Sequence, residues 1–238
     1  MIKLMTLVKA GPGISREKFA QHWRDEYLAE FTALHCVGNR LLKALHNHVL
    51  PNDIRDAEGL PGHAWAGISC YYFDSRSSVD ALLGDASYTA LRKAHSGIIT
   101  RTTDLPVDEI LIYDRDPSRL PVKMFAFFKR RPHMSRLEAL RYYRTTHADV
   151  GASINRNRIS RYIQNHVVDG YRNPDGAWDY DGGPETWFKT LEIATDLFSD
   201  REAMEILGKD EENFVIRGEL LHFLTDEKLI FDRQPAAI

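Results

Sequence analysis

The amino-acid sequence repeats itself once, and this repeat constrains the fold more than any other feature. Residues 3–9 match residues 123–129 at a shift of 120. The segment DEILIYDR at 108–115 matches DEKLIFDR at 226–233 at a shift of 118. Several such matches in the same order indicate a tandem duplication, which has to be recognised before single elements are assigned.

Each copy shows the same succession of strands and helices, which predicts two domains, 1–116 and 121–238. The first helix of each is expected to follow a serine N-cap and to bury one aromatic stripe, which in the first copy is Phe19, Trp23, Tyr27 and Phe31. Strands are expected at 2–9, 41–50, 66–73 and 109–113, and at 122–129, 158–168, 187–195 and 227–231. The second helical regions are expected at 76–99 and 199–222, broken near Gly84 and Gly208. The prediction is an α+β fold of two tandem ferredoxin-like βαββαβ repeats, with their sheets packed together within one chain.

Composition excludes several classes of protein. A net charge of −3 without a basic stripe argues against a nucleic-acid partner. No apolar run approaches the ~18 residues that a membrane span needs, and the N-terminus lacks the pattern of a signal peptide. Only Cys36 and Cys70 are present, which excludes a disulfide framework. We therefore expect a soluble, cytoplasmic protein that binds neither nucleic acid nor membrane.

The chain resembles a known family in both halves. The segments SREKF at 15–19 and HWRD at 22–25, and in the second half SR at 135–136, YRTTHA at 143–148 and RYIQNHV at 161–167, are similar to the EthD-domain family of the dimeric α/β-barrel superfamily. So is YDG at 180–182. The resemblance implies an intrachain barrel of the kind that other members build from two chains. It leaves the reaction open, because the superfamily holds cofactor-free decarboxylases, cyclases, dehydratases, isomerases and haem-dependent enzymes.

The two copies depart from each other at one position that matters for this resemblance. The family usually carries a histidine near the end of the first helix, and the second half has His147 there, followed by Ala148. The first half has Tyr27 and Leu28 instead. We expect two unequal pockets, of which the second is the working one.

Candidate site residues cluster in the second half. His147 continues the helical stripe of Ala139 and Tyr143, so it is expected to point toward the sheet. Alternation along the following strand places Tyr162, Gln164 and His166 on one face, where they would line a cavity. The alternatives are a core histidine bonded to a backbone carbonyl and an exposed polar edge strand.

A long loop rich in glycine, aspartate and proline follows that strand, at 169–184. Such loops often cover a binding site, and its aromatic residues Tyr171, Trp178 and Tyr180 could cover a flat aromatic substrate. The alternative is a surface loop held in place by those rings. The first-half loop, 51–62, has no aromatic residue, and the corresponding first-half contacts are Trp23, Tyr27 and His48.

No cofactor is expected from the sequence. His46 and His48 have the spacing that puts two imidazoles on one strand face, but no third ligand is evident and the second half does not share His46. A haem attachment motif and a phosphate-binding loop are also missing. The cysteines lack an activating environment.

These observations predict a cofactor-independent lyase, namely a decarboxylase, dehydratase or cyclase acting on a small aromatic or polyketide-like compound. His147 and His166 would act as acid and base, while Tyr143 and Tyr162 would orient the substrate or stabilise a developing phenolate or enolate. The expected partner is a small hydrophobic or aromatic substrate, and a homodimer stays open. The alternatives are a non-catalytic binding protein for a hydrophobic catabolite and a haem- or metal-dependent enzyme.

Overall fold

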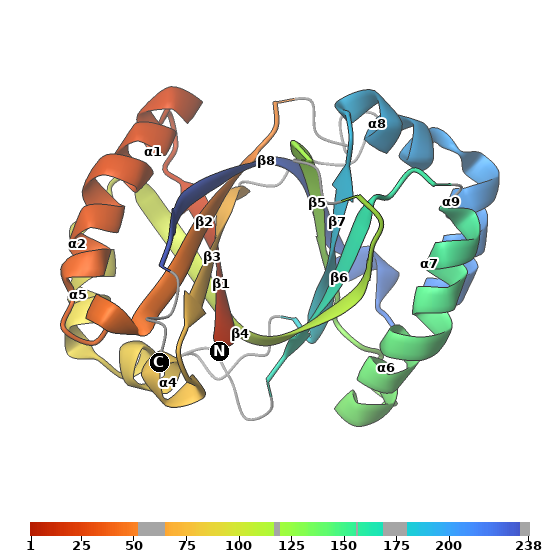
Figure 1. Cartoon of the computed structure of the whole chain (residues 1–238), viewed down its shortest axis with the longest axis horizontal. Helices are drawn as coiled ribbons and strands as arrows, with labels where there is room; N and C mark the ends of the chain where they lie inside the picture. Colours follow the sequence, from red (N-terminus) through yellow and green to blue (C-terminus); the bar gives the residue numbers. More distant parts are fainter. Residues whose placement is uncertain (52–64, 117–119, 156, 169–179, 234–238) are drawn as a thin grey trace. The chain divides into compact units, whose positions relative to one another are not determined.

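The computed structural model describes residues 1–51, 65–116, 120–155, 157–168 and 180–233 (Figure 1). The chain divides into two compact units. The first unit holds Met1–Val49, the chain from the third strand to Val107, and the chain from Glu227 on, and the second holds Leu50 and Asp108–Asp226. Two long strands, β4 and β8, each belong to both units, so the units do not coincide with the two sequence copies.

The first unit is an antiparallel sheet with helices on one of its faces. The hydrogen-bonding order is β4-β1-β3-β2, and the end of β8 lies beside β2, where the N–H of Arg233 donates to the carbonyl of Leu42 at 2.7 Å. The strands are β1 (Ile2–Ala10), β2 (Leu41–Val49), β3 (Trp65–Phe73) and β4 (Ile99–Asp114). The helices are α1 (Arg16–His22), α2 (Leu28–Ala33), α4 (Arg76–Leu83) and α5 (Ala86–Ala94), with a π-turn, η1 (Trp23–Tyr27), between α1 and α2 and a 3-10 turn, η2 (Gly38–Arg40), before β2.

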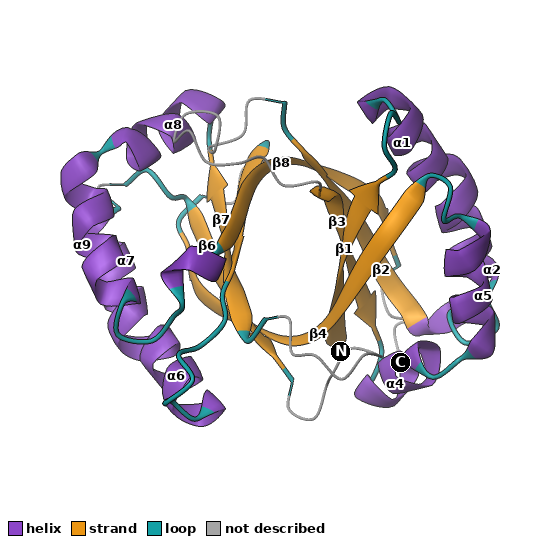
Figure 2. Cartoon of the chain, turned by 180° about the vertical axis from the view of Figure 1, so that it is seen from behind, coloured by secondary structure: helices purple, strands orange, loops and turns teal. Residues whose placement is uncertain are grey.

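The second unit has the same plan (Figure 2). Its order is β8-β5-β7-β6, and the end of β4 lies beside β6, where the N–H of Arg115 donates to the carbonyl of Ser160 at 2.9 Å. The strands are β5 (Val122–Phe127), β6 (Arg161–Val167), β7 (Gly182–Phe188) and β8 (Leu221–Asp232). The helices are α6 (Arg136–Tyr142), α7 (Ala148–Ile154), α8 (Leu191–Ser199) and α9 (Arg201–Glu211), with a π-turn, η3 (Tyr143–His147), and a 3-10 turn, η4 (Arg217–Glu219). None of the described helices is long and apolar enough to span a membrane.

Matching helix caps show why the two units form the same elements. Ser15 and Ser135 cap α1 and α6 with the same backbone angles, and Ser135 completes a capping box with Glu138. The other N-caps also correspond, with Ser75 and Thr190 before α4 and α8, and Asp85 and Asp200 before α5 and α9. Each cap side chain accepts a hydrogen bond from a backbone N–H of the first turn that has no partner within the helix.

The α+β class is confirmed. Within each unit every strand has an antiparallel neighbour. The predicted aromatic stripe of the first helix is also confirmed. All four of its residues are buried, and Trp23 and Phe31 are completely inaccessible. The π-turn has one residue more than a regular α-helical turn, and the aromatic stripe continues through it from α1 to α2.

Two predicted elements of the second half are wrong in their bounds. The strand expected at 187–195 is β7, Gly182–Phe188, because Thr190 already caps the following helix. The helical region expected at 199–222 is broken at Asp200 and not at Gly208, which lies inside α9. A Cβ at Gly208 would come within 2.8 Å of the guanidinium of Arg217, so this glycine makes room for a close neighbour and not for a helix end. The last strand of each copy also begins earlier than expected, at Ile99 instead of residue 109 and at Leu221 instead of residue 227.

The register gives the two faces of the second sheet different chemistry. The face that the helices cover carries the β6 side chains Tyr162, Gln164 and His166, as alternation predicted. The opposite face carries a fully buried ion pair, in which Nζ of Lys123 lies 2.5 Å from Oε2 of Glu185. Nδ2 of Asn165 donates to Oε1 of the same carboxylate at 3.1 Å.

We expect Gly67→Ala to destabilise the protein. A Cβ at this position would lie 2.6 Å from the Trp23 ring and 2.7 Å from the carbonyl oxygen of Asn47, and both neighbours are buried. Overpacking of this kind costs about 1–3 kcal/mol of unfolding free energy, which urea denaturation would measure. Gly97→Ala is the control, because its Cβ would meet nothing within 4 Å. Equal stability of the two variants would contradict this description of the helix–sheet contact.

Candidate active site

His147 is hydrogen-bonded to a carboxylate from another helix. It ends the π-turn η3, and its Nδ1 lies 2.7 Å from Oδ2 of Asp210, near the end of α9. The other carboxylate oxygen, Oδ1, accepts a hydrogen bond from the hydroxyl of Tyr142 at 2.7 Å. The side chains of His147 and Asp210 are only 12% and 7% exposed. The contact therefore lies in a partly dehydrated place, where such bonds are strong.

The protonation of this pair follows from its hydrogen bonds. Burial by itself raises the pKa of Asp210, but the bonds from His147 and Tyr142 outweigh this effect and leave the pKa below its ordinary value. Asp210 is therefore ionised at neutral pH, and an ionised carboxylate only accepts hydrogen bonds. Nδ1 of His147 must then carry the proton in the neutral ring, which leaves the lone pair on Nε2. Nε2 makes no hydrogen bond with the described part of the chain.

Aromatic rings surround His147 on the sheet side. The ring of Phe214 lies 5.0 Å away and that of Tyr143 lies 5.5 Å away, centroid to centroid. Burial also raises the pKa of the neighbouring Glu211, an effect that His147 and Arg217 partly offset. The surroundings of the imidazole are thus poor in water, as a site for proton transfer requires.

Gln164 connects the helix layer to the sheet. Its Nε2 donates to the backbone carbonyl of Tyr143 at 2.7 Å and to the hydroxyl of Tyr162 at 2.8 Å. Its Oε1 accepts a hydrogen bond from Nε2 of His166 at 3.1 Å. Burial lowers the pKa of His166 to about 4, and the cations Arg144 and Arg136 add to the shift. His166 is therefore a neutral hydrogen-bonding group at physiological pH, poorly suited to be the acid that the sequence suggested.

Five of the predicted site residues meet around the ring of Tyr143, which lies 5.4 Å from His166 and 5.5 Å from His147. Burial raises the pKa of both Tyr143 and Tyr162, so both hydroxyls stay protonated and can donate. Tyr180 lies elsewhere, with its ring against Phe127 on the face that carries the Lys123 ion pair. Tyr171 and Trp178, the other aromatic residues of the predicted loop, lie outside the described residues.

The first unit places different side chains at the matching positions. Trp23 stacks on His46 at 3.9 Å, and His48 meets the edge of Trp23 at 5.2 Å. Tyr27, in the place of His147, packs against His95 at 5.3 Å. The predicted first-half contacts are thus parts of a packed aromatic cluster.

The counterpart of the Tyr142–Asp210 bond in the first unit is a bond between two histidines. His22 Nε2 and His95 Nδ1 lie 2.9 Å apart. Their contacts with carboxylates go to Glu26 and Glu30, which are 63% and 61% exposed. Within the described residues, no group of three or more His, Cys, Asp or Glu side chains is arranged to hold a metal ion.

Asp210 and Tyr142 are the site residues that sequence reasoning missed. One signal could have found them. Phe73 pairs with Ile2 and Phe188 pairs with Val122, so the third strands and the helices that follow them correspond at a shift of 115, whereas the last strands correspond at 118. At that shift Asp210 falls on His95, which exposes the contrast between a carboxylate and an imidazole.

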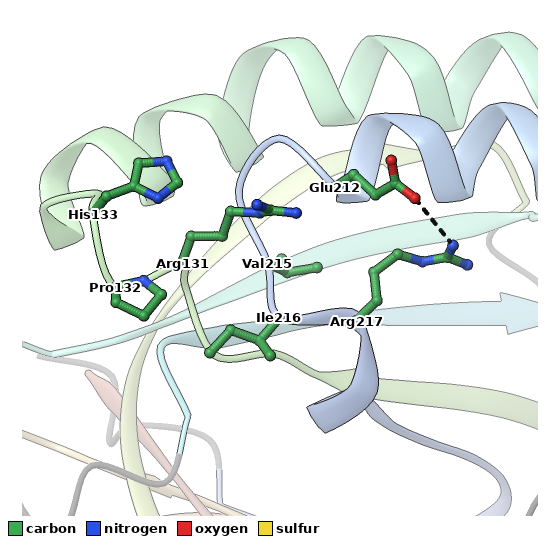
Figure 3. Close-up of a pocket in the computed structure, with 7 residues that line it drawn as sticks. All are labelled: Arg131, Pro132, His133, Glu212, Val215, Ile216 and Arg217. Atoms are coloured by element: carbon green, nitrogen blue, oxygen red, sulfur yellow. Dashed lines mark ion pairs between the residues drawn. The ribbon is translucent and has the colours of Figure 1, made fainter.

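A pocket of about 560 Å³ is lined by residues that precede and follow Phe214 in the sequence (Figure 3). The backbone N–H of Arg131 donates to the carbonyl of Phe214 at 2.9 Å, which joins the pocket wall to the ring that contacts His147. Arg217 lies 3.8 Å from Glu212 across the pocket, and the guanidinium of Arg131 makes no ion pair with the described residues. The lining is Arg131, Pro132, His133, Glu212, Val215, Ile216 and Arg217.

Comparison with known proteins identifies the part of the chain that holds this site. The model of the EthD domain matches residues 131–218. This part of the chain is therefore similar to the EthD domain. The match contains the His147–Asp210 pair, the β6 row and the pocket, and it confirms the family resemblance seen in the second copy. No curated protein sequence matches the chain.

Solved structures that are similar to the chain share its fold at very low sequence identity. An anthrone oxidase-like protein has a TM-score of 0.68 at 10% identity, with 100% of this chain and 96% of that chain covered. A protein of Fusobacterium nucleatum provisionally named a monooxygenase has a TM-score of 0.52 at 4% identity, with 100% and 95% covered. A protein provisionally named a chlorite dismutase has a TM-score of 0.50 at 8% identity, with 97% and 96% covered. Likeness at this level establishes the α+β fold of the chain, and not its activity.

We expect His166 to make the stability of the protein depend on pH. Its pKa is about 4 in the folded chain, against about 6.5 in the unfolded chain. The unfolded state therefore binds more protons between these values, so the unfolding free energy is highest above pH 6.5 and falls as the pH drops toward 4. Burial of His46 acts in the same direction, so the test compares wild type with His166→Gln.

Urea denaturation between pH 7.5 and 4.5 measures this difference. The stability advantage of wild type over His166→Gln should shrink by about 2 kcal/mol over that range, after allowance for the partial exposure of the ring. Parallel pH curves for the two proteins would show that His166 is not desolvated as described.

Proposed function

We propose that the protein is a cofactor-independent enzyme of the lyase type, and that His147 of the EthD domain transfers the proton. The observation that carries this proposal is the 2.7 Å contact of His147 Nδ1 with Asp210, which directs the lone pair of the ring to Nε2. A histidine oriented by a buried carboxylate is the usual form of a general base that must also hold the proton it takes up. The substrate class is a small aromatic or polyketide-like compound.

The proposed reaction needs one proton to be moved twice. Nε2 of His147 accepts a proton from a hydroxyl or an acidic carbon of the substrate, and Asp210 stabilises the imidazolium without being protonated itself. The electron pair left on the substrate forms a phenolate or enolate and drives the cleavage or closure of a neighbouring bond. The imidazolium then returns the proton to the product or to the leaving group.

Other residues of the EthD domain fit supporting roles. The hydroxyls of Tyr143 and Tyr162 stay protonated, so they can donate to a developing oxyanion. His166 and Gln164 hold the helix against the sheet and fix the position of Tyr143. The arginine-lined pocket suits a substrate with a carboxylate or another anionic group.

The name of one fold neighbour supports this class of substrate. That structure is named for its likeness to an anthrone oxidase, and anthrones are fused aromatic ketones with an acidic carbon. We also infer that the two units are tandem ferredoxin-like repeats and that the second is the catalytic one, since only there does a histidine meet a buried carboxylate at this position.

A haem-dependent reaction is the second candidate, because a histidine whose Nδ1 is held by a carboxylate is also typical of metal ligands. His147 would hold the iron through Nε2, which makes no hydrogen bond with the described part of the chain, and the haem would supply redox chemistry there. We derive no step through it.

We expect His147→Gln to lower kcat by about 10²-fold or more, the usual effect of losing a general base. Asp210→Asn should also lower kcat, because an amide cannot stabilise the imidazolium. The assay incubates the protein with a panel of hydroxylated aromatic carboxylates and anthrone-type ketones and follows the products by mass spectrometry. Asp149→Asn is the matched control, because Asp149 is an exposed carboxylate on the next helix.

The same panel of compounds also distinguishes an enzyme from a non-catalytic binding protein. Tight binding of a compound without turnover would favour a binding protein over an enzyme. Turnover that survives both His147→Gln and Asp210→Asn, in variants that circular dichroism shows to be folded, would contradict the assignment of the base.

A further inference from the structure

A small pocket in the first unit is lined mainly by cationic and hydroxyl side chains. Its volume is about 180 Å³, the space of on the order of six water molecules in the liquid. The residues that matter here are Tyr27, Arg92, Lys93, Thr100, Arg101 and Thr102. No carboxylate is among the described residues that line it.

The positive charge of this pocket is only partly neutralised. Arg92 forms an ion pair with the buried carboxylate of Asp104 and donates to the hydroxyl of Tyr88 at 2.7 Å. Lys93 and Arg101 make no ion pair with any residue that the structure describes. Arg101 lies over the ring of Trp65, 5.8 Å from its centroid, and its guanidinium makes no hydrogen bond with the described residues. Two exposed cations that line one pocket and lack an ion-pair partner there are a common basis for binding an anion.

The end of α5 does not cancel this charge. Lys93 stands in the last turn of the helix, where bare carbonyl groups would repel an anion. These carbonyls are capped, since Ser96 Oγ donates to the carbonyl of Lys93 at 2.8 Å and the N–H of Ile98 donates to that of His95 at 3.0 Å. The pocket thus presents donors more than acceptors.

Tyr27 gives the pocket a buried donor in place of a base. Burial raises its pKa, so its hydroxyl stays protonated. It occupies the last position of the π-turn η1, as His147 does in η3. A protonated phenol can bind an oxyanion, but it cannot take up a proton at neutral pH. The matching place in the first unit therefore has the chemistry of binding and not of proton abstraction.

We propose that the first unit holds a non-catalytic binding site for a small oxyanion, either an aromatic carboxylate or inorganic phosphate, held by Lys93, Arg101 and the hydroxyl of Tyr27. Arg92 is held beside the site by its ion pair with Asp104 and by its hydrogen bond to Tyr88. The site is built from first-unit residues alone, so it does not depend on the reaction proposed for the EthD domain.

The full-length protein can be titrated with sodium benzoate and, separately, with inorganic phosphate at constant ionic strength, with backbone amide NMR as the readout. We expect saturable shifts at residues 93–102 for at least one of the two anions, and the responding anion identifies the source. Benzamide, the neutral analogue, should produce no such shifts. The double variant Lys93→Gln/Arg101→Gln should weaken binding by about tenfold or more, as expected for lost charge-assisted hydrogen bonds.

The double variant Arg16→Gln/Lys18→Gln is the control, because it removes the same charge from exposed positions of the first unit outside the pocket. It should bind like wild type. Tyr27→Phe should weaken binding several-fold while Lys93 and Arg101 are intact. No saturable shift with either anion, or equal weakening by the two double variants, would overturn the proposal.

Discussion

The contact between the π-turn η3 and strand β6 is the interaction on which the second unit and its site depend. The ring of Tyr143 lies at its centre, with His147, His166, Phe128 and Phe214 around it. Its backbone carbonyl accepts from Gln164, so the helix is fixed to the sheet by a buried hydrogen bond as well as by packing. Since His147 closes the same turn, the packing that holds the helix also sets where the imidazole meets Asp210.

The first unit packs its helix against its sheet with other residues, and its side chains at the matching positions therefore offer different functional groups. Trp23 fills the place of Tyr143 and stacks on His46, which is completely buried. Gly67 and the matching glycine of the second sheet, Gly182, each make room for a backbone carbonyl, but the ring beside Gly67 is that of Trp23 and the ring beside Gly182 is that of Phe128. The two units thus keep the same helix–sheet contact, while the second places a histidine bonded to a buried carboxylate where the first places a tyrosine.

Much of this could be predicted from the sequence, because periodicity reports which side chains share a face. The stripe ending at His147 and the row of Tyr162, Gln164 and His166 lie where alternation placed them. No local pattern indicates Asp210, since the contact joins two segments 63 positions apart, and a comparison of the two copies shows it only at the shift of 115 that the strand register gives. The strand expected at 187–195 failed for a related reason, because the cap formed by Thr190 overrides an apolar run that suits either a strand or a helix.

The central claim is that Asp210 holds the proton of His147 on Nδ1 and leaves Nε2 free to act as a base. The most direct test is long-range ¹H–¹⁵N correlation NMR of the imidazole rings in the intact protein at a pH where His147 is neutral. The account predicts that His147 is present as the Nδ1–H tautomer, and that Asp210→Asn reduces the population of this tautomer. A dominant Nε2–H tautomer in the wild-type protein would contradict the role given to Asp210, because the lone pair of the ring would then be on Nδ1, which faces Asp210, and not on Nε2.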